Sequence, residues 1–321
     1  MSNENENESA VWHDALHPES VKAYGIDLLK RAEGAKLFQT GLVDWDRACD
    51  DTGGGLDDFW YVVIGGASNV GKTQLLISLA KQGLLQKFAV VVVTMEEPLE
   101  QIQRRIYAGL SDLGYHDFTY KNFSRSKAAR LVETTPYVGK LAINGDLPKE
   151  DLKSIIEYLD EARDMLFGRP MIVILDNLQL VKPENGSSIA SAATEVSEGL
   201  RRWAKVNRTL TFALSQVTSE ALRAGRPVRC HDLWGGSSMY SNPSQVIMLD
   251  HLNAVVDDHR PWIKRLWGLV DKNRYGPKMV FLMLEANMKT GDWRCGTPDE
   301  EILWGPNPWA PPEDTRGGYG R

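Results

Sequence analysis

Short apolar runs alternate with helical patterns of hydrophobic residues along most of the chain. Runs rich in Val, Ile and Leu without polar alternation are typical of strands buried on both faces of a parallel sheet. They predict strands at 61–64, 88–94, 139–143, 171–175, 209–215, 244–250, 264–271 and 278–285. Apolar residues at helical spacing between them predict helices at 72–82, 98–112, 149–167 and 189–206. This alternation predicts an α/β fold with a mostly parallel, twisted sheet flanked by helices.

The two ends of the chain differ from this region, which we assign to one domain at 38–295. Residues 1–17 are polar and are predicted to be disordered. A linker follows at 18–37, and its helical apolar spacing from about residue 19 to 33 predicts an isolated amphipathic helix. The stretch 296–321 is rich in Pro and Gly and contains Trp304 and Trp309, so we predict an irregular tail there.

Charge and hydropathy argue against a protein that coats nucleic acid with its whole surface and against one that spans a membrane. The 321 residues include 37 Lys and Arg and 43 Asp and Glu, for a net charge of −6. This balance argues against coating of nucleic acid by the whole surface, so contact with DNA must be local. The longest apolar run, 88–93, is far shorter than the roughly 20 residues of a membrane span. The polar N-terminus is unlike a secretory signal, and we expect a cytoplasmic protein that makes no membrane contact.

Residues 66–73 fit the phosphate-binding pattern G-x-x-x-x-G-K-[ST]. They lie between a predicted strand and a predicted helix, which is the context that the pattern requires. Backbone N–H groups of such a loop face phosphates, while its lysine reaches the outer phosphates and its hydroxyl faces Mg²⁺. A Gly-rich turn that only caps a helix is the alternative. We therefore predict a site for ATP and Mg²⁺ formed by Gly66, Ala67, Ser68, Asn69, Val70, Gly71, Lys72 and Thr73.

Three further polar residues follow predicted strands. Asp176 ends the run 171–175 and, downstream of a phosphate-binding loop, is a candidate Mg²⁺ ligand together with Thr73. Glu96 follows the strand 88–94 and is a candidate general base for the attacking water. Its neighbour Glu97 is suited to the start of the next helix. Gln216 follows the strand 209–215 and is a candidate sensor of the outer phosphate.

These motifs, in their order along the chain, carry a resemblance. They are 38–46 (FQTGLVDWD), 53–56 (GGGL), the phosphate loop, 94–98 (TMEEP), 176–180 (DNLQL), 215–216 (SQ) and 272–277 (KNRYGP). Together, over about 38–294, they resemble the ATPase domain of DnaB-type replicative helicases. An ordered set of this kind is much more specific than a phosphate loop alone.

The resemblance implies a RecA-like P-loop NTPase core. It implies a homo-oligomer, a hexameric ring, with ATP bound between subunits and single-stranded DNA threaded through the centre. The family's nucleotide-site positions are occupied by Lys72, Thr73, Glu96, Asp176 and Gln216. The pair that the adjacent subunit offers to the γ-phosphate corresponds to Lys272 and Arg274. Without the resemblance, Arg274 would be interpreted as a solvated loop cation.

The chain departs from the family pattern in two places. Fewer than 40 residues precede the core, so we expect the N-terminal primase-binding domain and its coupling to primase to be missing. In the central loop after the sensor strand, Trp234 and Gly235 stand where such helicases commonly have an Arg-Glu pair. Backbone N–H groups and aromatic rings in that loop are still suited to a DNA strand. The candidate DNA-binding residues there are Trp234, Gly235, Gly236 and Ser237.

Three arginines precede the central loop. Arg223, Arg226 and Arg229 alternate with apolar residues and are candidate contacts to DNA phosphates. A solvated basic loop is the alternative interpretation.

We therefore expect an ATPase that acts as a DnaB-type replicative helicase. One alternative is a RecA-like recombination or annealing ATPase, which would form filaments on single-stranded DNA. The other is a nucleotide-gated scaffold or loader whose Trp- and Pro-containing tail docks a replication partner. Stimulation of the ATPase by single-stranded DNA separates the last alternative from the first two.

Overall fold

The computed structural model describes residues 36–49, 54–110, 141–144, 147, 149–166, 170–182, 189–250, 252 and 254–310. The predicted disordered segment 1–17, the predicted helix at 19–33 and the end of the predicted tail, 311–321, lie outside the described residues. None of the helices in the described ranges is both long and apolar enough to span a bilayer.

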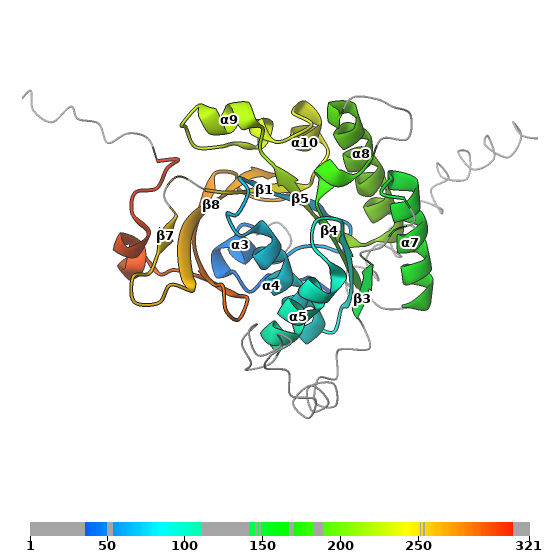
Figure 1. Cartoon of the computed structure of the whole chain (residues 1–321), viewed down its shortest axis with the longest axis horizontal. Coiled ribbons are helices and arrows are strands. Elements are labelled where there is room, and N and C mark those ends of the chain that lie inside the picture. The colour runs from blue at the N-terminus through cyan, green and yellow to red at the C-terminus, as the bar shows by residue number, and fades with distance from the viewer. Residues whose placement is uncertain are drawn as a thin grey trace, which may run out of the picture. The chain divides into compact units, whose positions relative to one another are not determined.

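A ten-stranded sheet forms the centre of the protein (Figure 1). Its order is β10-β9-β8-β6-β1-β5-β4-β2-β3, with β7 paired to β8. The strands from β3 to β6 in this order run parallel, and β8, β9 and β10 continue the sheet with antiparallel pairing. The predicted α/β class is confirmed. The bounds are β1 Tyr61–Gly66, β2 Ala89–Thr94, β3 Leu141–Asn144, β4 Met171–Asp176, β5 Leu210–Gln216, β6 Gln245–Leu249, β7 Val255–Val256, β8 Ile263–Asn273, β9 Val280–Asn287 and β10 Asp292–Cys295.

Helices cover both faces of the parallel half, with α4 and α5 on one face and α7 and α8 on the other (Figure 1). Apolar side chains from each face form a separate buried cluster. The α-helices are α3 Val43–Arg47, α4 Lys72–Leu85, α5 Leu99–Leu110, α7 Leu152–Met165, α8 Ile189–Asn207, α9 Ser219–Arg223 and α10 Ser237–Ser241. The 3-10 helices are η4 Leu178–Leu180, η5 Cys230–Asp232 and η6 Pro298–Trp304.

The register of the parallel strands brings several loops to one edge of the sheet. Gly66 at the end of β1 pairs with Gln216 at the end of β5. Thr94 at the end of β2 pairs with Asp176 at the end of β4. Because these strands end at the same level, the loops that follow them meet at the carboxyl edge, where open α/β sheets bind ligands.

A short helix that the hydrophobic pattern did not predict, α3, fixes the start of the domain. Thr40 donates from its backbone N and its hydroxyl to one carboxylate oxygen of Asp46, both at 2.8 Å. The indole of Trp45 donates to the Gln245 side chain at 2.6 Å. These buried contacts attach the motif 38–46 to the first residue of β6. The motif therefore has a structural role within a single subunit.

The prediction of an irregular tail is wrong for Pro298–Trp304, which forms the 3-10 helix η6. Trp304 is fully buried, and its indole donates to the Leu284 carbonyl at 3.0 Å. A side-chain carbon at Gly296 would come within 2.5 Å of the Trp304 ring, which explains glycine at that position. The indole of Trp309 donates to the Val228 carbonyl at 3.0 Å. Both tryptophans therefore contact the domain itself.

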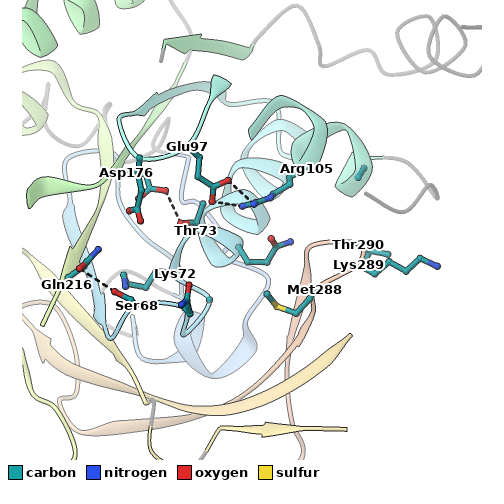
Figure 2. Close-up of a pocket in the computed structure, with 15 residues that line it drawn as sticks. Ser68, Lys72, Thr73, Glu97, Arg105, Asp176, Gln216, Met288, Lys289 and Thr290 are labelled. Carbon is teal, nitrogen blue, oxygen red and sulfur yellow. Dashed lines mark hydrogen bonds and ion pairs between the residues drawn. The ribbon is translucent and has the colours of Figure 1, made fainter. Parts of the chain in front are cut away.

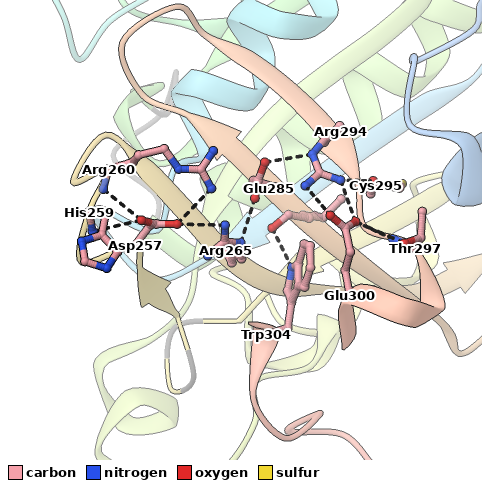
Figure 3. A network of polar contacts seen from close by, with 11 residues as sticks. Asp257, His259, Arg260, Arg265, Glu285, Arg294, Cys295, Thr297, Glu300 and Trp304 are labelled. Atoms are coloured by element: carbon pink, nitrogen blue, oxygen red, sulfur yellow. Dashed lines mark hydrogen bonds and ion pairs between the residues drawn. The ribbon is translucent and has the colours of Figure 1, made fainter. Parts of the chain in front are cut away.

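A chain of ion pairs joins η6 to the antiparallel half (Figure 3). Arg265 contacts Asp257 at 3.0 Å and Glu285 at 2.8 Å, and Arg294 contacts Glu285 and Glu300 at 2.8 Å each. The Arg294 guanidinium lowers the pKa of Glu300 to about 2. A carboxyl with a lowered pKa stabilises the fold above its ordinary pKa near 4, and this contribution is lost as the pH falls toward 2.

We expect Trp304→Ala to lower the free energy of unfolding by about 3–5 kcal/mol, because it removes a fully buried aromatic ring that packs against the sheet. Urea denaturation followed by circular dichroism measures this difference. Ile302→Ala in the same 3-10 helix is the control, since that side chain is 88% exposed and should change stability by no more than about 0.5 kcal/mol. Equal midpoints for the two variants would contradict the assignment of Trp304 to the core.

Candidate nucleotide-binding site

The loop 66–73 connects β1 to the N-terminus of α4. Gly71 directly precedes the first residue of α4. Its φ is +115°, a backbone conformation that residues with a side chain rarely adopt. A Cβ atom there would also lie 3.3 Å from the Trp293 ring. The first turn of α4 contains no acidic residue. Its free N–H groups and the helix dipole therefore favour an anion at this position.

Lys72 lies inside this loop. Its amine donates to the carbonyls of Ala67 at 2.7 Å and Gly66 at 3.1 Å. Burial lowers the pKa of Lys72 to about 8, and the nearby carboxylates of Asp176 and Glu96 oppose this shift. A cation so placed, with only weak carbonyl partners, is suited to bind phosphate oxygens.

Thr73 and Asp176 meet across the end of the sheet. The Thr73 hydroxyl donates to Oδ2 of Asp176 at 2.9 Å. The other carboxylate oxygen, Oδ1, is buried and has no hydrogen-bond partner among the described residues. Burial raises the pKa of Asp176 to about 6. A hydroxyl beside an unpartnered carboxylate oxygen fits Mg²⁺, which prefers hard oxygen ligands.

The adjacent glutamates after β2 have different partners. Glu97 forms an ion pair with Arg105 of α5, with two N–O contacts of 2.8 Å. Glu96 is exposed at the cavity and accepts a hydrogen bond from the side-chain amide of Asn177. Glu97 is therefore held by Arg105 of α5, and both glutamates line the cavity. Arg105 and Asn177 were not predicted, because nothing in the sequence pairs them with these glutamates.

Gln216 lies at the end of β5, beside the phosphate loop. Its Oε1 atom is 3.5 Å from the Ser68 hydroxyl. Its backbone carbonyl accepts a hydrogen bond from the N–H of Trp234 at 3.1 Å. Gln216 thus connects the loop 66–73 with the segment of the candidate DNA-binding residues.

These side chains surround one cavity of about 430 Å³ (Figure 2). The cavity brings together the predicted residues Ser68, Asn69, Gly71, Lys72, Thr73, Glu96, Asp176 and Gln216. A further wall comes from the turn between β9 and β10, with Met288, Lys289 and Thr290. Sequence reasoning missed this wall, because the turn reaches the site only through the antiparallel half of the sheet.

Two residues predicted to be catalytic, Lys272 and Arg274, are not among the residues that line this cavity. β8 runs antiparallel to β6, and Asn273, between Lys272 and Arg274, pairs with Gln245 of β6. Gln245 in turn pairs with Val62 of β1. The phosphate loop begins four residues later, at Gly66. At roughly 3.3 Å per residue, about 13 Å of strand separates the two levels. The pair therefore lies at the amino edge of the parallel strands, and its catalytic role stays a prediction.

The three predicted DNA-contacting arginines differ in their surroundings. Arg226 forms two hydrogen bonds, of 2.6 and 2.7 Å, with the Asp232 carboxylate. Arg229 contacts Asp271 from Nε at 2.8 Å and also from a terminal nitrogen. Arg223, exposed at the end of α9, has no carboxylate partner among the contacts of the described residues. DNA contact stays a prediction for all three.

The remaining candidates are Trp234, Gly235 and Gly236, which lie between η5 and α10, and Ser237, the first residue of α10. Gly235 and Gly236 have φ angles of +93° and +52°. Their backbone conformation turns the chain into α10, whose Tyr240 side chain is 45% exposed. Contact with DNA is likewise a prediction for these residues.

The sheet with helices on both faces, the phosphate loop and the carboxylate at the end of β4 define a RecA-like P-loop NTPase. The model of the DnaB-like helicase C-terminal domain matches residues 38–290. The chain belongs to this family.

Solved structures with this fold include an isolated ATPase domain, with a TM-score of 0.70 and 17% identity over 88% of this chain and 99% of that one. A DnaB-like replicative helicase described with its primase interactions has a TM-score of 0.67 and 17% identity, over 84% of this chain and 65% of that one.

Curated relatives include the DNA repair protein RadA of Listeria monocytogenes, 24% identical over 60% of this chain and 35% of RadA. They also include a "Probable plasmid replicative DNA helicase" of Chlamydia psittaci, 24% identical over 72% of this chain and 50% of that protein. The chain thus spans half or less of the length of these relatives.

Proposed function

We propose that this protein is an ATP-dependent DNA helicase of the DnaB type, which hydrolyses ATP at subunit interfaces to translocate on single-stranded DNA during replication. The observation that carries the proposal is the separation of the nucleotide cavity from Arg274, which would be two half-sites of one catalytic centre. The cavity with Lys72, Asp176 and Glu96 lies at the carboxyl edge of the parallel strands, and Arg274 is exposed at the other edge. A ring of such chains would bring the two half-sites together.

In this proposal each residue of the cavity has one role. The loop N–H groups and Lys72 bind the phosphates, and Thr73 and Asp176 hold Mg²⁺, which when bound neutralises phosphate charge. Glu96 accepts a proton from the attacking water. Gln216 contacts the outer phosphate and, through the N–H of Trp234, the candidate DNA segment.

We expect single-stranded DNA to increase the steady-state ATPase rate of the full chain, and we expect the protein to separate a forked duplex in the presence of ATP and Mg²⁺. Rates with and without DNA, together with strand displacement, measure both activities. The Lys72→Ala variant controls for contaminating ATPases. An ATPase rate that DNA leaves unchanged would contradict the proposal and favour a nucleotide-gated scaffold or loader.

The similarity to RadA supports a second candidate, a RecA-like ATPase in recombination or annealing. Such a protein would also respond to single-stranded DNA. Electron microscopy in the presence of ATP and DNA separates the two, since the helicase proposal requires closed rings and the alternative requires filaments.

A further inference from the structure

The turn after β2 brings two consecutive carboxylates, Glu96 and Glu97, to the nucleotide cavity. Two contacts fix this turn. The Thr94 hydroxyl donates to the Glu97 carbonyl at 3.1 Å, and the N–H of Met95 donates to the Asp176 carbonyl at 2.8 Å. Together with the side chain of Asp176, three carboxylates line the cavity. Such a lining opposes the binding of a polyanion like ATP, because like charges repel each other strongly where water is partly excluded.

Arg105 of α5 lines the same cavity and binds both oxygens of one of these carboxylates. Its two terminal nitrogens lie 2.8 Å from Oε1 and Oε2 of Glu97 (Figure 2). A guanidinium and a carboxylate that meet through two such contacts fix each other's orientation. Both side chains are only 23% exposed, so the pair is partly shielded from water. Arg105 therefore fixes the Glu97 carboxylate and compensates its charge.

Glu96 has a neutral partner, the side-chain amide of Asn177. An amide can orient a carboxylate but leaves its negative charge in place. Burial raises the pKa of Asp176 to about 6, and the charges of Glu96 and Glu97 act in the same direction. Both glutamates are therefore close enough to influence the candidate Mg²⁺ ligand, and they differ in the partner that holds them.

We propose that Arg105 is a positioning residue that keeps the Glu97 carboxylate away from the Mg²⁺ site and so leaves Glu96 to meet the attacking water. A carboxylate is a ligand that Mg²⁺ prefers. Without the arginine, Glu97 would approach the cation held by Thr73 and Asp176 and compete with the phosphates for it. The inference rests on the proposed function, because it takes Glu96 as the base.

Binding of Mn²⁺ to the full chain without nucleotide tests the contact independently of turnover, with free Mn²⁺ measured by electron paramagnetic resonance. We expect Arg105→Gln to bind Mn²⁺ about tenfold more tightly, because a released carboxylate joins Asp176. The double variant Arg105→Gln/Glu97→Gln should return to the affinity of the unaltered protein. Arg104→Gln is the control, since Arg104 lies on the same helix but is not among the residues that line the cavity.

Turnover of ATP in the presence of Mg²⁺ gives a second readout. We expect Arg105→Gln to lower kcat by about 10- to 100-fold with little change in KM, because a misplaced group at the metal disturbs the reacting geometry more than binding. Adding Glu97→Gln to this variant should recover most of the loss, since a neutral amide is a weaker metal ligand. An arginine that acted directly on the nucleotide would show no such recovery.

Three results would overturn the proposal. They are an unchanged Mn²⁺ affinity in Arg105→Gln, a double variant as slow as Arg105→Gln alone, and a loss of about 10²-fold or more in Glu97→Gln alone, which would make Glu97 the base. If Arg105→Gln does not fold, Arg105→Lys replaces it. That variant keeps the charge but loses the two-point contact, so we expect smaller effects of the same sign and the same recovery.

Failure of the proposed function can be told apart from failure of this inference. If DNA does not stimulate the unaltered protein, or if Glu96→Gln turns over normally, the proposed function or the assignment of the base fails. The Mn²⁺ titration uses neither nucleotide nor DNA, so it still decides whether Arg105 keeps Glu97 away from the metal site.

Discussion

Arg274→Ala is expected to reduce ATP turnover by about 10³-fold or more while leaving ATP affinity nearly unchanged. The physical reason is that a cation placed on the transferring phosphoryl group stabilises charge that develops only in the transition state. The side chain lies at the edge of the sheet away from its own phosphate loop, so we expect it to act on the next subunit. Steady-state kinetics and a nucleotide-binding titration measure the two quantities separately.

Mixed rings provide the decisive measurement for Arg274. A Glu96→Gln subunit keeps its arginine, and an Arg274→Ala subunit keeps its cavity, so junctions that combine the intact halves should regain hydrolysis. Lys278→Ala, which removes an exposed cation from the same turn, is the control and should turn over normally. If mixtures with demonstrated subunit exchange give only the sum of their separate rates, action on the neighbouring subunit is wrong.

Lys72→Ala and Glu96→Gln are expected to fail in different ways. The lysine amine lies within the phosphate loop, so its loss should weaken ATP binding as well as turnover. The Glu96 carboxylate faces the cavity, and its replacement should leave binding intact while turnover falls by about 10² to 10⁴-fold. Calorimetric titration with ATP and a steady-state assay compare the two variants.

Glu100→Gln is the matched control for Glu96, because that side chain is exposed on the first turn of α5. It should leave both affinity and turnover unchanged. An equal loss of ATP affinity in the Lys72 and Glu96 variants would contradict the role of Glu96 as the base. Glu97, which pairs with Arg105, would then be the next carboxylate to test.

Those parts of the fold that depend on local pattern could be predicted from sequence. The runs that became β1, β2 and β4 are buried at every position, so their continuous hydrophobicity was a direct signal. The loop at 66–73 was recognisable because its glycines and its lysine have fixed spacing between a strand and a helix. The same local signals placed Asp176 and Gln216 at strand ends.

Features that depend on tertiary contacts could not be predicted in this way. The segment at 298–304 lies in a stretch, 296–321, that is rich in Pro and Gly, and tertiary contacts of the buried Trp304 and of Glu300 with Arg294 hold it as a 3-10 helix. Met288 reaches the nucleotide cavity through the pairing of β9 with β10. Lys272 donates to the carbonyls of Tyr240 and Ser241, and the motif at 272–277 does not indicate these contacts, because they depend on the antiparallel β8.

The antiparallel direction of β8 has a consequence for regulation by assembly. Because it carries Arg274 to the edge away from the chain's own phosphate loop, the proposed function requires each chain to present its nucleotide cavity to one neighbour and Arg274 to the other. Head-to-tail contacts of this kind form closed rings or open filaments, and in either assembly a complete site would exist only between two chains. Dilution below the assembly concentration should therefore switch hydrolysis off without any inhibitor, and the protein would spend ATP only where enough copies have gathered.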